Sequence, residues 1–253
     1  MLQRLNPFFN KLPIYFTTRT EGVSLAPYDS LNLALHTGDN PALVQGNRAL
    51  ICEQLGITPQ MVITARQEHG NSILEVDTAS VNTWAATYDA LPAADALITA
   101  TRNIYLSILV ADCAAVYLYD GKNQAIALLH AGWRSVYQQI IEKTLRLMTE
   151  RFATQAADCQ AYISPSMKSC CFEIQPQTFP TSERDWQAQN VFAKRLGKHY
   201  FDLTETIRQR LLQAGLSPGR IQASEFCTVC NQRFFSYRRE GMTGRQTALW
   251  GLN

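Results

Sequence analysis

The sequence lacks both the long apolar run of a membrane protein and the charge excess of a nucleic-acid-binding protein. No stretch of the 253 residues approaches the roughly 20 apolar residues that cross a bilayer. Lys and Arg number 23 against 21 Asp and Glu, so the net charge is only +2. This balance gives no electrostatic reason to expect a nucleic acid or an anionic membrane as partner.

A secretion signal is also missing, because residues 1–7 lack the basic and then apolar segments of one. We therefore expect the chain to stay in the cytoplasm, where thiols are kept reduced. The seven cysteines are an odd number, which disfavours a framework of disulfides. They are best interpreted as free, metal-bound or catalytic.

No internal repeat, low-complexity tract or Ser/Gly linker divides the chain, so we expect one continuous domain over residues 1–253. A helix is predicted to start at Asn40-Pro41, as cap and first turn, and to end at Gly56. Its predicted apolar stripe consists of Leu43, Leu50, Ile51 and Leu55. Two later helices are predicted, one capped by Ser135 and running to about residue 152, the other over residues 202–215.

Three buried strands are predicted in the middle of the chain, at residues 105–110, 115–119 and 125–129. Residues 120–123 are typical of a turn, so the second and third strands should form a hairpin. That hairpin would bring Cys113 and His130 to the same edge of the sheet. Because helices and strands interleave, the fold class is α/β or α+β with a sheet core.

Two histidines and one cysteine have unusual neighbours. His69 lies in a polar stretch beside a glycine, and Cys113 and His130 each end an apolar strand. Two imidazoles and one thiolate suit Zn²⁺ and leave a fourth position for water or substrate. Such an ion lowers the pKa of bound water from about 15.7 to about 7. The alternative is that each histidine is a satisfied core or turn residue and Cys113 is a small hydrophobe.

Short motifs then follow one another through nearly the whole chain. They lie at residues 17–24, 30–33, 36–39, 67–70, 94–99, 111–113, 130–134, 227–228, 234–239 and 244–245. Any one of them is weak, but the set in this order is highly specific. It resembles the YfiH family, also called the laccase-domain or multicopper polyphenol oxidase family.

The resemblance implies that His69, Cys113 and His130 are zinc ligands in a pocket. It also implies a single-domain, layered α-β-β-α sandwich with mixed sheets, related in architecture to a toxin class with a Cys-His hydrolase site. Similar members split adenosine, inosine, guanosine or methylthioadenosine with phosphate and also deaminate adenosine. Bacterial members have further been linked to editing of peptidoglycan precursors. The implied partners are therefore a purine nucleoside and phosphate.

Three positions depart from the family pattern. Glu21 stands where a second glycine is usual, and Ala114 where a proline often follows the Asp-Cys pair. Gln175-Pro176 replaces a glycine-containing continuation of the preceding motif. The first two leave the metal set intact, whereas the third puts substrate contacts from that loop in doubt.

Phosphate is a further requirement of such a reaction, and arginine binds it through paired, charge-assisted hydrogen bonds. The arginines in the matched motifs are Arg19, Arg134, Arg238, Arg239 and Arg245. Arg19 and Arg134 are the strongest candidates, and Arg238 is a further one. The alternative for each is a solvated or ion-paired surface group.

Other polar residues of the motifs have two interpretations each. Asn32 and Asp112 can bind the sugar or the base. Asp112, which we expect among the catalytic residues, can instead orient a ligand histidine from behind. Glu68 can shuttle protons or simply be exposed. Trp133 and the pair Phe234-Phe235 can stack on a purine ring, although aromatics so placed are more often core.

The remaining cysteines give weaker signals. Cys227 and Cys230 form a lone CxxC pair, for which a thioredoxin-like or second zinc role has little support. Cys227 is predicted to line the pocket and Cys230 to be structural. The adjacent pair Cys170-Cys171 is predicted to have no metal role.

Three alternatives to zinc catalysis remain. The first is copper oxidation, because a His₂Cys set resembles a blue-copper site. That geometry normally adds a weak axial ligand such as Met. A multicopper laccase also needs a histidine-rich cluster, and this chain has only four histidines. The second alternative is a metal-free Cys-His hydrolase with Cys113 as nucleophile. The third is a structural zinc, which would be one ligand short. Nothing in the sequence sets the oligomeric state, and we expect a monomer.

Overall fold

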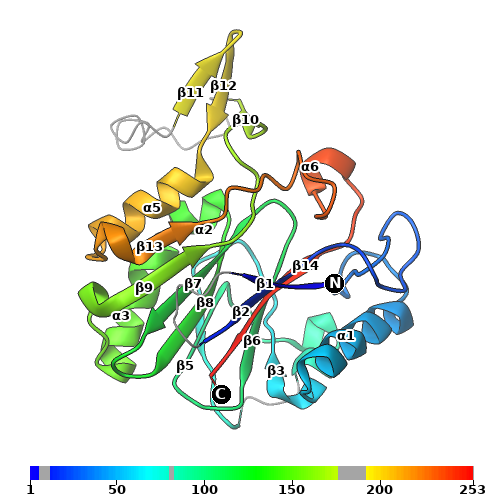
Figure 1. Ribbon diagram of the computed structural model, residues 1–253, viewed down its shortest axis with the longest axis horizontal. Helices are drawn as coiled ribbons and strands as arrows, with labels where there is room; N and C mark the ends of the chain where they lie inside the picture. Colours follow the sequence, from blue (N-terminus) through cyan, green and yellow to red (C-terminus); the bar gives the residue numbers. More distant parts are fainter. Residues whose placement is uncertain (6–11, 80–82, 176–191, 253) are drawn as a thin grey trace.

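Two large β-sheets form the centre of the fold, and helices cover the outer face of each (Figure 1). The computed structural model describes residues 1–5, 12–79, 83–175 and 192–252. One sheet has five strands in the order β1 (Leu2–Leu5), β2 (Ile14–Thr17), β14 (Gln246–Gly251), β6 (Tyr105–Val110) and β3 (Val62–Ile63). It is antiparallel except where β3 pairs with β6.

The other large sheet holds the central hairpin. Its six strands follow the order β13 (Ile221–Ala223), β9 (Cys159–Ile163), β7 (Ala114–Asp120), β8 (Ala125–Ala131), β5 (Ala96–Thr99) and β4 (Ile73–Glu75). Only its two outer pairs are parallel. A small third sheet, β10 (Glu173–Ile174), β12 (Lys198–Phe201) and β11 (Phe192–Arg195), projects from the body of the molecule (Figure 1).

Five helices and five short 3₁₀ turns accompany these sheets in the described residues. The helices are α1 (Pro41–Leu55), α2 (Trp133–Tyr137), α3 (Ile140–Phe152), α5 (Leu203–Gln213) and α6 (Tyr237–Glu240). The 3₁₀ turns are Pro59–Met61, Thr83–Ala85, Tyr88–Ala90, Ala156–Asp158 and Pro218–Arg220. Among the described residues, no helix has both the length and the apolar character that crossing a membrane requires.

Strand periodicity sorts the buried side chains into three cores. Alternate residues of β7 and β8 point either toward the five-stranded sheet or toward the helices, because strand side chains alternate between faces. Tyr117 and Leu128 fill the space between the sheets, whereas Val116 and Leu129 pack with α3 and α5. The outer face of the five-stranded sheet packs against α1. The layer order is therefore α-β-β-α, which confirms the predicted fold.

Helix α1 has the predicted ends but not the predicted buried face. Asn40 accepts a hydrogen bond from the backbone N–H of Ala42, and Gly56 closes the helix with a left-handed conformation. Ile51 is fully buried, but the leucines of the predicted stripe are only half-buried. The helix instead buries Asn47 and Arg48, whose side chains bind carbonyls of the 22–34 segment.

The central hairpin is confirmed, and the helix after it is broken. β7 and β8 pair in register over their whole length, with Ala115 opposite His130. The single helix predicted from Ser135 is wrong, because Gln139 has a positive φ of 64° and separates α2 from α3. Gly132 occupies the cap position of α2, and Ser135 lies inside that helix. The helix predicted at 202–215 is present as α5, capped by the side chain of Asp202.

Candidate metal centre and ligand cavity

His69, Cys113 and His130 meet at one end of the central hairpin. Their possible ligand atoms all lie within 4.8 Å of one another. Cys113 directly precedes β7, and His130 is near the end of β8, so the hairpin register brings them together. His69 reaches them from the connection between β3 and β4, and its ring lies 4.7 Å from that of His130, nearly perpendicular to it. These three side chains could hold one metal ion.

Asp95 organises this centre, and its role was not predicted. Its carboxylate is 1% exposed and lies 2.8 Å from Nδ1 of His130. It also accepts the backbone N–H groups of the 68–70 loop, at 3.1, 3.0 and 2.8 Å. One side chain thus fixes the orientation of one candidate ligand and the loop that carries another. Because Nδ1 of His130 is engaged, Nε2 is the nitrogen left for a metal.

The electrostatics of the centre favour a metal-ready thiolate. Burial raises the pKa of the Cys113 thiol, but the adjacent His130 outweighs it and brings that pKa down to about 6. Burial lowers the pKa of His130, but Cys113 and Asp95 outweigh it and raise it to about 9. Cys113 and His130 therefore favour the thiolate and imidazolium forms. A divalent cation can take the place of the proton on Nε2 of His130.

Gly132 provides the space that the centre needs. A Cβ at this position would lie 3.0 Å from Sγ of Cys113 and 3.4 Å from a ring carbon of His69. Real Cβ atoms essentially never approach heavy atoms more closely than the first of these distances. An alanine here would require the Cys113 sulfur to give way by a few tenths of an ångström.

A cavity of about 540 Å³ opens beside the three candidate ligands. Its wall includes the aromatic residues Tyr88, Trp133, Phe172 and Tyr237. It also includes the arginines Arg134, Arg238 and Arg245. A volume of this size suits a small organic molecule with both an apolar ring and an anionic group.

Arg245 is the cavity arginine best placed for an anion. It is half-buried, and burial lowers the pKa of its guanidinium. One of its terminal nitrogens donates to the carbonyls of Thr243 and Gly244, at 2.8 and 3.0 Å. None of the ion pairs found among the described residues includes Arg134, Arg238 or Arg245, but the first two are exposed and only Arg245 is half-buried. A partly buried cation without a carboxylate partner is suited to bind a negatively charged ligand.

Two predicted phosphate-binding arginines also line the cavity, and one does not. Arg134 lies over the ring of Trp133, and Arg238 over that of Phe172, at 4.9 and 5.5 Å. Arg19 is not among the cavity residues. Its guanidinium pairs with Asp29 and Glu240 at 3.2 and 2.5 Å, so its charge is already matched.

Asn32 acts behind the cavity, because it is fully buried and outside the lining. Its amide nitrogen donates to Thr37 and Asp39, and its oxygen accepts the backbone N–H of Arg245 at 2.9 Å. Arg239 is likewise structural, since its guanidinium binds three backbone carbonyls and Glu240. Sequence reasoning ranked Arg19 above Arg245 because motif membership does not reveal which guanidinium is already paired.

Asp112 lines the cavity, but its carboxylate is engaged elsewhere. One oxygen accepts the hydroxyl of Thr228 and the other the backbone N–H of Arg238, both at 2.6 Å. The residue is 6% exposed and has a positive φ of 91°. It thus ties the start of α6 to the end of β6, whereas Asp95 orients His130, the candidate ligand.

The other expected residues are placed as follows. Glu68 pairs with Arg66 at 3.1 Å on the exposed side of its loop. Trp133 lines the cavity, whereas the 234–235 aromatics are buried core. Cys227 is absent from the lining and lies with Cys170, Cys171 and Cys230. Pro176 lies outside the described residues.

Two departures from the family pattern fit the local backbone. Glu21, at the position where glycine is usual, has a positive φ of 70° and an ion pair with the amino terminus at 3.5 Å. Ala114 is the first residue of β7 and is fully buried.

His36 lines the cavity, and sequence reasoning left it without a role. Its ring lies 4.4 Å from that of Tyr88. Burial, with Arg245 and Arg48 nearby, lowers its pKa to about 4, so it is neutral at physiological pH. Its place in a matched motif was the available signal, because histidine is scarce in this chain.

The layered sheets and the His₂Cys set beside a cavity define an α/β protein with a candidate mononuclear metal pocket. Residues 13–253 match the family described as multi-copper polyphenol oxidoreductase laccase. The chain belongs to this family, which confirms the resemblance found in its motifs.

Relatives and solved structures agree with this membership. A purine nucleoside phosphorylase of Corynebacterium glutamicum is 32% identical over 98% of this chain and 97% of its own. One of Xylella fastidiosa is 36% identical over 90% of this chain and 87% of its own. The crystal structure of YlmD from Geobacillus stearothermophilus has a TM-score of 0.90 at 29% identity, over 98% and 94% of the two chains. That of Bacillus licheniformis YfiH has a TM-score of 0.88 at 31% identity, over 97% and 94%.

Proposed function

We propose that this chain is a zinc-dependent purine nucleoside phosphorylase that acts on adenosine, inosine, guanosine and methylthioadenosine. The names of its relatives support this proposal. The observation that carries it is the cavity itself, which combines three metal donors with a half-buried arginine, Arg245, that has no ion pair within the described part of the chain. We also infer a single catalytic domain that works as a monomer in the cytoplasm, where Cys113 stays reduced.

The residues of the centre fit a zinc ion. Two imidazoles and one thiolate are the donor types zinc prefers, and three protein ligands leave one position for water or substrate. When bound at His69, Cys113 and His130, the ion would act as a Lewis acid and lower the pKa of a water molecule. The hydrogen bond that Nδ1–H of His130 donates to Asp95 keeps Nε2 of His130 available to the ion.

Phosphate would bind on the arginine side of the cavity. Arg245, with Arg134 and Arg238, presents guanidinium groups that hold phosphate oxygens through charge-assisted hydrogen bonds. Two hydrogen bonds keep Arg238 in place. Its backbone N–H donates to the Asp112 carboxylate at 2.6 Å, and its guanidinium donates to the Glu173 carbonyl at 3.0 Å. Asp112 therefore supports the reaction as a positioning residue.

The nucleoside would bind against the aromatic side of the cavity. Trp133 and Phe172 offer flat apolar faces on which a purine can stack. In the reaction an oxygen of phosphate forms a bond to C1′ of the ribose as the bond from C1′ to the purine nitrogen breaks. The purine leaves with the electron pair and takes up a proton, and the sugar is released as its 1-phosphate.

Deamination of adenosine is part of the proposal. It requires water to add to the purine carbon that bears the amino group, with release of ammonia. The same donor set supports it, because an activated water and a purine would share one cavity.

Copper oxidation and metal-free hydrolysis are the competing functions. The family description names copper, but the whole chain has four histidines, too few for the several coppers that reduce oxygen in a laccase. A Cys-His hydrolase, for example one that edits peptidoglycan precursors, would use the Cys113 thiolate as nucleophile, and chelation would leave its activity intact.

One experiment separates these functions. Purified protein is incubated with adenosine under nitrogen, with and without phosphate, and the products are analysed together with the bound metal. Phosphate-dependent release of adenine by zinc-containing protein supports the proposal, and inosine formed in both reactions supports deamination. Oxidation of phenols that needs copper and O₂, without any nucleoside turnover, would overturn it.

A further inference from the structure

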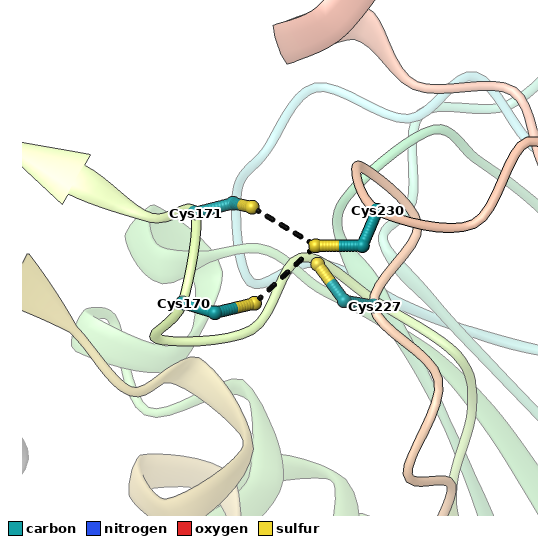
Figure 2. Close-up of side chains that lie close together, drawn as sticks. All are labelled: Cys170, Cys171, Cys227 and Cys230. Carbon is teal, nitrogen blue, oxygen red and sulfur yellow. Dashed lines mark hydrogen bonds between the residues drawn. The ribbon is translucent and has the colours of Figure 1, made fainter.

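Four cysteines meet at a point outside the nucleoside cavity. Cys170 and Cys171 lie on the connection between β9 and β10, and Cys227 and Cys230 on the connection between β13 and α6. Figure 2 shows the side chains of both segments converging on Cys230. Its sulfur is 3.3 Å from that of Cys171 and 3.7 Å from that of Cys170. All four sulfurs lie within 4.8 Å of one another.

This spacing matches that of sulfurs around a metal rather than that of a disulfide. With a zinc–sulfur bond of about 2.3 Å, neighbouring sulfurs at the corners of a tetrahedron are about 3.8 Å apart. A disulfide joins only two sulfurs, at about 2.05 Å. Here one sulfur faces two others and a fourth lies beside them, so a single pair does not describe the group.

Contacts of the backbone hold the two segments together independently of the sulfurs. Ser166 pairs with Cys227 in a parallel bridge, and the backbone N–H of Thr228 donates to the Ser166 carbonyl at 3.1 Å. The backbone N–H of Lys168 points at the sulfur of Cys227, at 3.5 Å. An amide that donates to sulfur stabilises the thiolate form, which is the form that binds metals.

We propose that Cys170, Cys171, Cys227 and Cys230 form a second metal site, a closed tetrathiolate that binds one Zn²⁺. Four thiolates select a thiophilic ion over the hard cations Mg²⁺ and Ca²⁺. Because four protein ligands fill a tetrahedron, this ion has no open position and its role is structural. The site is distinct from the His₂Cys centre and does not depend on the proposed nucleoside chemistry.

The second site would stabilise one wall of the cavity. Phe172, which lines the cavity, directly follows Cys171 in the chain. The side chain of Arg238 donates to the carbonyls of Cys171 and Glu173, at 3.4 and 3.0 Å. A zinc ion that fixes the cysteine loop therefore also fixes the position of Phe172 and the orientation of Arg238.

Metal counting on the full chain tests the proposal. Protein purified under reducing conditions is reconstituted with zinc, freed of excess metal, and weighed by native mass spectrometry. We expect two zinc ions per wild-type chain and one in each of Cys230→Ser and Cys113→Ser. Cys52→Ser is the matched control, because Cys52 is buried in α1 outside both groups, and it should retain two. Cys230 is exposed, so its replacement should leave the fold intact.

Cobalt gives a second readout that needs no variant to fold. Co²⁺ bound by four thiolates absorbs in the near ultraviolet about four times as strongly as Co²⁺ bound by the single thiolate of the other centre. One zinc per wild-type chain that Cys230→Ser leaves unchanged would overturn the proposal. A Cys171–Cys230 disulfide that survives purification under reducing conditions would also overturn the proposal.

Discussion

Replacement of Asp95 by asparagine perturbs the centre with the smallest change in shape. The side chain is buried, and its two oxygens accept four hydrogen bonds. One oxygen takes the His69 N–H and Nδ1 of His130, and the other takes the N–H groups of Glu68 and Gly70. An amide keeps only one of these oxygens and turns the other into a donor.

Either orientation of the new amide is costly. If the NH₂ group faces the N–H groups of Glu68 and Gly70, two partly buried donors lose their acceptor, at no more than roughly 1–3 kcal/mol each. If it faces the other pair, the imidazole of His130 must accept at Nδ1, and its proton moves to Nε2, the nitrogen left for a metal. We expect Asp95→Asn to lose at most about 2–6 kcal/mol of unfolding free energy and 10–100-fold in zinc affinity.

Competition with a chromogenic chelator measures the zinc affinity, and urea unfolding measures the stability. Asp120→Asn is the matched control, because Asp120 is also fully buried and accepts the backbone N–H groups of Lys122 and Asn123, at the far end of the same hairpin. It should lose stability and keep the wild-type zinc affinity. Wild-type affinity in Asp95→Asn would refute the argument that this carboxylate holds the ligands.

Gly132→Ala should also weaken the centre, because the new methyl group would lie 3.0 Å from the Cys113 sulfur. The zinc content of this variant should fall. Gly219→Ala, whose methyl group would meet open space, should keep the wild-type zinc content. Arg245→Lys should raise the KM for phosphate about tenfold in steady-state assays, because lysine keeps the charge but loses the paired hydrogen bonds. An unchanged KM would show that other residues bind the phosphate. At Asp120, hydrogen bonds from the following turn outweigh burial and lower the pKa. Its stabilisation is therefore present above the unfolded pKa of about 3.9 and is lost as the pH falls through the lower folded value. The stability difference between wild type and Asp120→Asn, measured by urea unfolding, should shrink from pH 6 to pH 3, and a constant difference would contradict this.

Local signals predicted the elements that carry two of the candidate metal ligands, Cys113 and His130. The apolar runs at residues 115–119 and 125–129, with a turn between them, were enough to expect a hairpin with Cys113 and His130 at one edge, and the register confirms it. Caps at Asn40 and Gly56 likewise set both ends of α1. These signals work because they depend on neighbours within a few residues of the chain.

Features that depend on contacts between distant segments were missed. Asp95 reaches His130 only because β5 pairs with β8, 35 residues further along the chain. The break at Gln139 has no glycine or proline to mark it. α1 buries Asn47 because its amide binds carbonyls of another segment, which apolar periodicity cannot reveal.

The four-cysteine group shows the same limit. Cys171 and Cys230 are 59 residues apart, and the pattern of either segment alone is too weak to indicate a metal. The pair at 170–171 was predicted to have no metal role, and only the folded chain brings it to the CxxC pair. The sequence shows the two pairs of cysteines, but only the tertiary structure brings them together.

The central claim is that His69, Cys113 and His130 hold the zinc that phosphorolysis requires. Its most direct test is a metal titration of chelator-stripped Cys230→Ser protein, followed under nitrogen by phosphate-dependent release of adenine from adenosine. The account predicts no release without metal and a linear rise with added zinc that stops at one ion per chain. Full activity in the stripped protein, or activity restored by copper and O₂ but not by zinc, would contradict it.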